Sequence, residues 1–300
     1  MNNTSQQIRD LCRQKNAVIM AHYYQRPEIQ AVADFIGDSL ALAQQAQKTD
    51  ADIIVMCGVH FMAETAAILC PDKKVLIPDA TAGCSLADSC QAADLLAWKE
   101  QHPNHIVVSY VNTSAAVKAL SDVVVTSGNA IKIVNRLPKD AKILFGPDRN
   151  LGRYVNEQTG RTMDLWNGCC HVHDRFSLDN LMALKQQYPD ALVLAHPECR
   201  KQIVEQSDVV GSTAVLIKYV QEHPQNKYIV MTADGVDYEI YRSCPSVQLI
   251  NTENACEYMH QHTLDKLLAC LTNESPSVKV DDETAAKAIL PIRKMLDWSK

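Results

Sequence analysis

A pattern that recurs three times along the chain constrains its fold more than any other feature. Residues 17–24 (AVIMAHYY), 105–112 (HIVVSYVN) and 191–198 (ALVLAHPE) each begin with an apolar run and end in polar side chains. The first polar residues of the three endings are His22, Tyr110 and His196, which are 88 and 86 residues apart. Apolar runs of this length are typical of buried strands. The spacing therefore predicts an internal triplication.

Further apolar runs extend each repeat. A second set lies at residues 52–58, 122–128 and 207–213, and a third at residues 74–80, 142–148 and 228–235. Helical stretches separate these runs, and such alternation is typical of parallel βαβ units. We predict an α/β protein of three small layers, with domains at residues 1–84, 85–170 and 171–256. The tail, residues 257–300, contains amphipathic helical stretches that we expect to pack back on the first domain.

Each repeat closes on a cysteine. Cys84, Cys170 and Cys256 are separated by 86 residues in both intervals. If the repeats surround a pseudo-threefold axis, equivalent residues converge on it, and three thiols meet at one point. The chain has eleven cysteines, and this odd number without a secretory signal does not indicate a disulfide framework. Cys169 and Cys244 remain alternatives for the second and third positions.

Three converging thiols suit an iron-sulfur cluster. A 4Fe-4S cube held by three cysteines leaves one iron open, and that iron can act as a Lewis acid in dehydration chemistry. The stretch NGCCHVHD (167–174) also offers His171 and His173, and either one could complete a Cys3His zinc site with the three cysteines. The simplest alternative makes all three cysteines ordinary core residues.

Polar side chains follow the predicted strands, at the edge where ligands of open α/β sheets bind. These candidates are His22, Tyr24, Ser39, Tyr110, Asn112, Ser127, His196, Glu198, Ser212 and Thr213. Helix capping is the competing explanation for the hydroxyl residues, and a buried hydrogen-bonded role is the competing one for the histidines. Together they suit a dicarboxylate. Glu198 is the one carboxylate among them and hence a candidate base, with Tyr24 or Tyr110 as acid.

Composition excludes other classes of partner. The formal net charge is −6 and the 29 Lys and Arg residues are scattered, which argues against a nucleic-acid surface. No stretch approaches about 18 uninterrupted apolar residues, so we expect no membrane span. The polar N-terminus lacks an apolar signal core, which favours a cytoplasmic location. A small-molecule substrate fits best.

The ordered motifs resemble those of the quinolinate synthase family. The resemblance covers about residues 16–271, and the motifs that carry it are AHYYQ (21–25), GDSLALA (37–43), GVHFMAET (58–65), PDATAGCSLAD (79–88), SYVNTSAAVKA (109–119), TSGNA (126–130), FGPDRNLG (145–152), NGCCHVH (167–173), AHPEC (195–199), VGST (210–213), TADG (232–235) and CEYM (256–259). Agreement of many motifs in order and spacing makes the resemblance specific.

This resemblance implies three αβα sandwich domains around a pseudo-threefold axis, with the active site at its centre. It implies a 4Fe-4S cluster on Cys84, Cys170 and Cys256. The implied reaction condenses iminoaspartate, supplied by L-aspartate oxidase, with dihydroxyacetone phosphate to give quinolinate, phosphate and water. Tyr24, Tyr110 and Glu198 would be catalytic. The implied substrate-binding residues are His22, Ser39, Tyr110, Val111, Asn112, Ser127, His196, Pro197, Glu198 and Thr213.

One departure concerns the third cysteine. Some relatives carry a C-x-x-C run there, whereas NTENACEYM (251–259) offers Cys256 alone, so no local disulfide switch is expected. Two other functions remain open at this point: a zinc-dependent aldolase or hydrolase that uses the same cleft, and a non-catalytic iron-sulfur sensor. A sensor should carry a partner-binding module with a basic face, and the sequence shows none.

Overall fold

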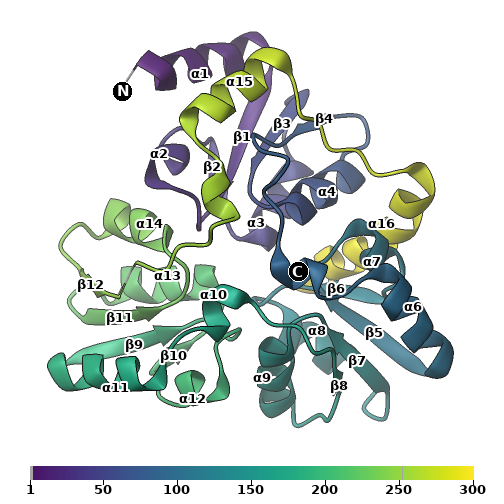
Figure 1. Cartoon of the computed structure of the whole chain (residues 1–300), viewed down its shortest axis with the longest axis vertical. Coiled ribbons are helices and arrows are strands. Elements are labelled where there is room, and N and C mark those ends of the chain that lie inside the picture. The colour runs from purple at the N-terminus through teal and green to yellow at the C-terminus, as the bar shows by residue number, and fades with distance from the viewer. Residues whose placement is uncertain (1–2, 252) are drawn as a thin grey trace.

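The computed structural model describes residues 3–251 and 253–300, and its strands form three four-stranded sheets that surround the centre of the molecule (Figure 1). All pairings within the sheets are parallel. The prediction of an α/β fold built from three parallel layers is confirmed. Helices cover both faces of such sheets, which explains why the strands read as apolar runs instead of alternating patterns.

The first unit opens with α1 (Asn3–Gln14) and orders its strands β2-β1-β3-β4. Its strands are β1 (Ala17–His22), β2 (Phe35–Gly37), β3 (Ile53–Cys57) and β4 (Lys74–Leu76), and the helices that follow them are α2 (Pro27–Gln30), α3 (Ser39–Ala46), α4 (His60–Leu69) and α5 (Ser85–Asp88). β1 and β3 lie in the middle of the sheet and are almost entirely buried.

The second and third units repeat this order. The second contains α6 (Ala92–Gln101), β5 (His105–Tyr110), α7 (Ala115–Ala119), β6 (Val123–Val125), α8 (Ala130–Arg136), β7 (Lys142–Gly146), α9 (Arg149–Thr159), β8 (Asp164–Leu165) and α10 (His171–Asp174). The third contains α11 (Leu178–Gln187), β9 (Ala191–Ala195), α12 (Lys201–Val204), β10 (Val209–Val210), α13 (Thr213–Glu222), β11 (Lys227–Met231), α14 (Val236–Ser243), β12 (Gln248–Ile250) and the short helix η1 (Met259–Gln261). The sheet orders are β6-β5-β7-β8 and β10-β9-β11-β12.

The matching of strands between repeats differs from our prediction in the first unit. Residues 52–58 were paired with residues 122–128 and 207–213, but they form β3, which occupies the place of β7 and β11 in its sheet. The true counterpart of β6 and β10 is the short strand β2, which comes after β1 and α2 in the chain. Its apolar run is only Phe35 and Ile36, and the longer apolar run of β3 gives the stronger strand signal in this part of the sequence.

An aspartate fixes the second strand of every unit. Asp34, Asp122 and Asp208 each accept a backbone N–H from the third residue of the neighbouring central strand, at 2.8, 2.7 and 2.7 Å. In each case the aspartate's own N–H donates to the carbonyl of that same strand residue, at 2.9 Å. These aspartates lie 88 and 86 residues apart, the intervals of the whole repeat. They align the two strands, so that the carboxyl ends of both open at the same edge.

The tail contacts two units. α15 (Leu264–Asn273) packs against α1, with Leu267, Cys270 and Leu271 buried in the same cluster as Ile8. α16 (Asp282–Ser299) packs mainly against α7 and β6 of the second unit and also against α4 of the first (Figure 1). The buried residues of α16 belong to a core cluster that joins the first and second units. The sequence predicts that the tail packs on the first unit alone. In the structure α16 also packs on the second unit.

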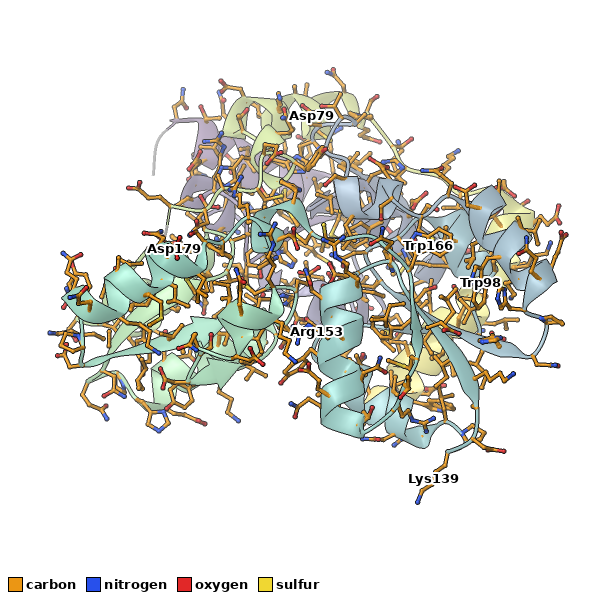
Figure 2. All side chains as sticks on the ribbon, turned by 60° about the horizontal axis from the view of Figure 1, so that its bottom comes forward. Asp79, Trp98, Lys139, Arg153, Trp166 and Asp179 are labelled. Carbon is orange, nitrogen blue, oxygen red and sulfur yellow. The ribbon has the colours of Figure 1, made fainter. Side chains whose placement is uncertain are left out.

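The third unit has hydrophobic clusters of its own, and polar contacts join it to the second unit. Arg153 of α9 lies at the boundary with the third unit and donates to the Cys199 carbonyl at 3.5 Å (Figure 2). Asn150 of the same helix donates to the Glu198 carbonyl at 3.1 Å. Among the described residues, no helix is both long enough and apolar enough to cross a membrane.

Candidate active site

A cavity of about 730 Å³, open mouth included, lies where the three units meet. All three cysteines of the 86-residue series line it: Cys84, Cys170 and Cys256. The polar residues predicted to bind substrate or move protons line it as well, namely His22, Tyr24, Ser39, Tyr110, Asn112, Ser127, His196, Glu198 and Thr213. Val111 and Pro197 are buried, and neither is among the described residues that line this cavity. Substrate contact by these two stays a prediction.

The lining residues fall into sets of three that occupy equivalent positions. His22, Tyr110 and His196 stand at the ends of β1, β5 and β9, the second strands from one edge of their sheets. A second set, Tyr24, Asn112 and Glu198, follows two residues later. The hydroxyl residues Ser39, Ser127 and Thr213 follow β2, β6 and β10. Because parallel strands present their carboxyl ends at one edge, the three sheets direct these nine side chains into one space.

The cysteine loops share one local structure. The carbonyls of Cys84, Cys170 and Cys256 accept the backbone N–H of the residue four positions later, at 3.0, 2.8 and 3.0 Å. Each cysteine thus begins a helical turn, and two of them are the residues that directly precede α5 and α10. The donor set fits an iron-sulfur cluster, because each unit contributes one sulfur to a shared and largely buried cavity.

The three thiols have pKa values above their ordinary range. Burial raises the pKa of Cys84 to about 12, and burial also raises the pKa of Cys170 and Cys256. A metal-free thiol in this site therefore stays protonated at neutral pH. Binding of a metal or cluster would release these protons, because thiolate is the ligand form.

Cys169 and Cys244, the alternative ligands considered from the sequence, are not among the described residues that line the cavity. Cys244 follows α14 and is buried in the apolar cluster of Ile240 and Val247 in the third unit. Cys169 is partly exposed beside Cys170, and the described residues that line the cavity do not include it. All eleven cysteines are free thiols.

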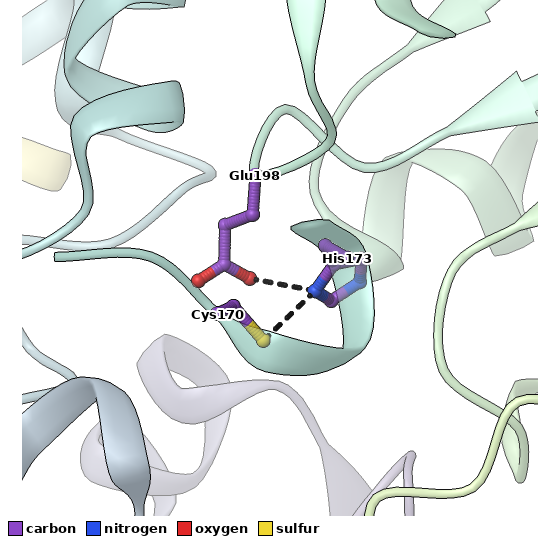
Figure 3. A group of neighbouring side chains, drawn as sticks. All are labelled: Cys170, His173 and Glu198. Carbon is purple, nitrogen blue, oxygen red and sulfur yellow. Dashed lines mark hydrogen bonds and ion pairs between the residues drawn. The ribbon is translucent and has the colours of Figure 1, made fainter. Parts of the chain in front are cut away.

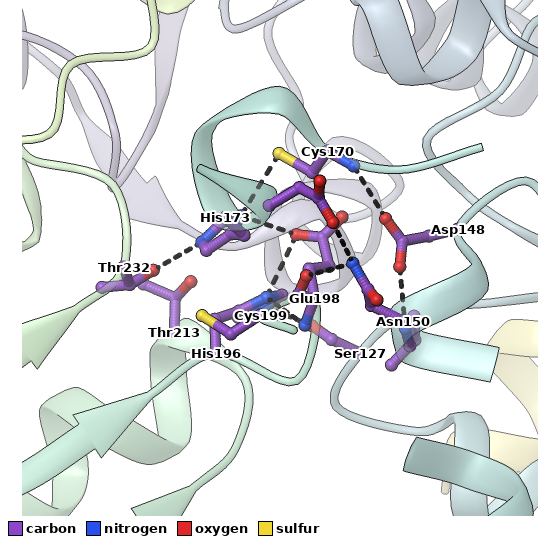
Figure 4. Close-up of polar contacts among 12 residues, drawn as sticks. Ser127, Asp148, Asn150, Cys170, His173, His196, Glu198, Cys199, Thr213 and Thr232 are labelled. Atoms are coloured by element: carbon purple, nitrogen blue, oxygen red, sulfur yellow. Dashed lines mark hydrogen bonds and ion pairs between the residues drawn. The ribbon is translucent and has the colours of Figure 1, made fainter. Parts of the chain in front are cut away.

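Glu198 is held by two histidines at the wall of the cavity (Figures 3 and 4). Its Oε2 lies 3.0 Å from His196 Nδ1 and 3.2 Å from His173 Nδ1, and all three side chains are buried. Burial alone would raise the pKa of Glu198, but His196 and His173 outweigh this effect and lower the pKa below its usual range. The carboxylate is therefore ionised. Its second oxygen, Oε1, is buried and has no hydrogen-bond partner among the described residues.

Tyr24 lies at the centre of a hydroxyl network. Its OH is 2.7 Å from both Thr213 Oγ1 and Thr232 Oγ1. Thr232 Oγ1 is in turn 3.0 Å from His173 Nε2 (Figure 4). Burial raises the pKa of Tyr24 and that of Tyr110 well above the ordinary value, so both phenols keep their protons. A buried phenol with a hydroxyl network can serve as a proton donor.

Neutral imidazole is the resting form of His22. Burial, and then the nearby His196, lower the pKa of His22 to about 3. The backbone N–H of Tyr24 donates to His22 Nδ1 at 3.1 Å, so the single ring proton is on Nε2. His22 thus offers one hydrogen-bond donor. Among the described residues that line the cavity there is no Lys or Arg.

Sequence reasoning missed several residues of the site. His173 was considered only as a zinc ligand, whereas it contacts Glu198, Thr232 and the Cys170 sulfur at 3.2 Å (Figure 3). Asp148 is fully buried and accepts the Cys170 N–H at 2.9 Å (Figure 4). Asp148 also caps α9, and its place two residues after the end of β7 is the available signal. Thr232 directly follows β11, near the corresponding strand end of the third unit.

A smaller metal site is also possible. Sγ of Cys170, a ring nitrogen of His173 and a carboxylate oxygen of Glu198 all lie within 4.8 Å of one another (Figure 3). This set contains one sulfur, one nitrogen and one oxygen, and zinc accepts all three. It is an alternative to the Cys3His set predicted from the sequence.

Comparison with known proteins gives a uniform result. A family model described as quinolinate synthetase A protein matches residues 6–297. The chain is similar to the quinolinate synthase of Synechocystis sp., with 51% identity over 299 residues that cover 97% of this chain and 94% of that protein. The quinolinate synthase of Prochlorococcus marinus (strain MIT 9303) is 50% identical over 300 residues, 98% of this chain and 90% of that protein. The quinolinate synthase of Microcystis aeruginosa is 48% identical over 299 residues, which cover 97% of this chain and 94% of that protein.

Proposed function

The chain belongs to the quinolinate synthetase A family, and we propose that it condenses iminoaspartate with dihydroxyacetone phosphate to form quinolinate, phosphate and water. The observation that carries this proposal is the convergence of one cysteine from each of three repeated units on a single cavity lined by uncharged donors. The proposal includes a cytoplasmic location, with which eleven free thiols agree. Iminoaspartate would come from L-aspartate oxidase.

Cys84, Cys170 and Cys256 would hold a 4Fe-4S cluster in this cavity. Support comes from the soft donor set, from the equivalent backbone turns that present it, and from the burial that excludes water. When bound, such a cluster would supply an open iron that acts as a Lewis acid toward a substrate hydroxyl or carboxylate.

The substrates are anions, yet the chain offers them neutral donors. His22 Nε2–H and the hydroxyls of Ser39, Ser127 and Thr213 line the cavity, and the last three follow the second strands of their units. The N-termini of α3 and α13 add partial positive charge there. Asn112 supplies an amide whose Oδ1 is buried and unpartnered among the described residues, which suits a ligand donor at that point. The N–H and O–H donors of this set would bind the carboxylates and the phosphate, whereas Asn112 Oδ1 would accept a hydrogen bond from a donor group of the substrate.

Proton transfer would fall to Glu198, Tyr24 and Tyr110. Glu198 is ionised and has a free oxygen, so it can accept a proton during the dehydration that forms the aromatic ring. Tyr24 and Tyr110 are protonated and can donate to a leaving hydroxyl or phosphate. His196 and His173 orient the base, because both hold its Oε2 and leave Oε1 toward substrate.

The direct test supplies both substrates. Anaerobically purified protein is incubated with L-aspartate, L-aspartate oxidase and dihydroxyacetone phosphate, and quinolinate is measured by mass spectrometry. We expect product that depends on all components. A protein loaded with iron and sulfide that makes no quinolinate would contradict the proposal.

A zinc-dependent aldolase or hydrolase is the second candidate, because Cys170, His173 and Glu198 could bind one ion without help from the other cysteines. On this alternative, Cys84→Ala and Cys256→Ala would keep the metal, and the purified protein would be colourless. On the cluster proposal both variants lose iron, and the native protein is brown.

A further inference from the structure

The residues that directly follow the three cysteines form a chain of hydrogen bonds. Ser85 Oγ lies 2.9 Å from His171 Nδ1, and His171 Nε2 lies 2.8 Å from Glu257 Oε2. Ser85, His171 and Glu257 are 86 residues apart, in step with the cysteines. Each link therefore joins two different units: the first connects the loop of Cys84 to that of Cys170, and the second connects the loop of Cys170 to that of Cys256.

The third side of this triangle is closed by packing. The ring of Tyr258 stands edge-on to that of His171, with centroids 5.6 Å apart. A Cβ placed on Gly83 would be 3.9 Å from the Tyr258 ring, so Tyr258 of the third loop also covers the first loop. Gly83, His171 and Tyr258 all line the central cavity. The three loops thus touch one another in a closed ring around the cysteines.

The turns that carry the cysteines are internal to each loop and do not fix one loop relative to another. A shared ligand, by contrast, requires the three sulfurs at set positions. We propose that Ser85, His171 and Glu257 form an inter-unit clasp that positions the three cysteine loops for one common cluster. This inference rests on the proposed function in that the ligand is the cluster. The clasp residues act through the cysteine loops and are therefore positioning residues.

Glu257 and Asp164 provide a matched comparison. Glu257 is 59% exposed and pairs with His171, and Asp164 is 63% exposed and pairs with His105 at 3.0 Å. Neither His105 nor Asp164 is among the described residues that line the central cavity. The test variants are Ser85→Ala, His171→Ala and Glu257→Ala, with Asp164→Ala as control. Glu257→Gln is the conservative variant, because its amide oxygen still accepts a hydrogen bond from His171.

Two measurements are made on each protein. The first is the rate at which the anaerobic holoprotein loses iron to a ferrous chelator. The second is the rate at which Cys84, Cys170 and Cys256 are alkylated in the metal-free protein, read by mass spectrometry. We expect both rates to rise about three- to tenfold in the three test variants, the size of effect that loss of one hydrogen bond produces. Asp164→Ala and Glu257→Gln should match the wild type.

Each result of these measurements either supports or contradicts the clasp. Wild-type rates in Ser85→Ala, His171→Ala and Glu257→Ala would overturn the clasp, as would an equal rise in Asp164→Ala. If the wild type binds no iron, the cluster proposal fails, but the alkylation rates still test whether the clasp holds the loops together. A melting temperature of Glu257→Ala equal to that of the wild type would show that the variant is folded.

Discussion

Glu198 shows at the scale of one residue how the fold sets chemistry. A buried carboxylate ordinarily becomes harder to ionise, because desolvation penalises the charge. Here the two imidazoles of His173 and His196 reverse this effect and lower its pKa. One oxygen is committed to the histidines and the other is free. Position and ionisation together make it the base of the proposed reaction.

Replacement of Glu198 by Gln should remove the base without removing the metal. We expect iron and sulfide contents near those of the wild type and a fall in turnover of roughly a hundredfold or more, the usual contribution of a general base. Iron analysis and quinolinate formation measure the two effects. Near-normal turnover in Glu198→Gln would assign the base elsewhere.

The sequence identified most of these residues but not their partners. The endings of the repeated strands single out His22, Tyr24, Tyr110 and Glu198 because a polar side chain after a buried strand is conspicuous. His173 and Thr232 lie in other segments: the packing of the second unit on the third brings His173 to Glu198, and the packing of the third unit on the first brings Thr232 to Tyr24. Such contacts depend on how units dock, which strand patterns do not encode.

At the scale of elements, the tail helices hold the first two units together. α15 is tied to the first unit by Lys266, which pairs with Asp79, and by Glu274 just after its end, which pairs with Lys15 at 2.7 Å. α16 inserts Ile292, Met295 and Leu296 into the core that the first and second units share. Sequence predicted amphipathic helices here, but not that α16 crosses to the second unit, because an apolar stripe does not identify its partner.

The substitution Met295→Ala should strongly lower the free energy of unfolding. Met295 is fully buried, and removal of a buried methionine side chain costs about 2–5 kcal/mol. Leu290 in the same helix is 66% exposed, so Leu290→Ala should change the free energy of unfolding by less than about 0.5 kcal/mol. Urea titrations of both variants compare the two sites. Equal effects would mean that α16 does not dock as described.

The ion pair of Asp79 should make α15 docking depend on pH. Burial would raise the pKa of Asp79, but hydrogen bonds from Lys266 and Thr81 outweigh it and lower the pKa to about 2, below the usual ~3.9. A lowered pKa stabilises the folded state above about pH 4, and this contribution is lost as the pH falls toward 2. The difference in urea midpoint between wild type and Asp79→Asn should therefore be largest above pH ~5 and shrink in acid.

Asp265→Asn serves as the control for this experiment, since Asp265 is an exposed carboxylate of the same helix. Its midpoint should follow that of the wild type more closely. A difference for Asp79→Asn that stays constant down to pH ~3 would mean that the carboxylate is not held in its charged form by Lys266.

The whole molecule is organised by its threefold repeat. The repeat predicted three parallel layers and the convergence of equivalent residues, because strand ends, hydroxyls and cysteines recur at 86 to 88 residues. It misassigned one strand of the first unit, because the longer apolar run of β3 gives a stronger signal than the two apolar residues of β2. The repeat also did not predict how the hydrophobic cores differ: the first two units share one cluster, and the third unit has clusters of its own.

Iron and sulfide content of cysteine variants tests the central claim most directly. The account predicts that Cys84→Ala, Cys170→Ala and Cys256→Ala each lose the cluster, because each removes the sulfur of one unit. Cys169→Ser and Cys244→Ser should retain it, since neither residue is among the described ones that line the cavity. A Cys84→Ala or Cys256→Ala protein with full iron and sulfide, or a native protein that contains zinc in their place, would contradict it.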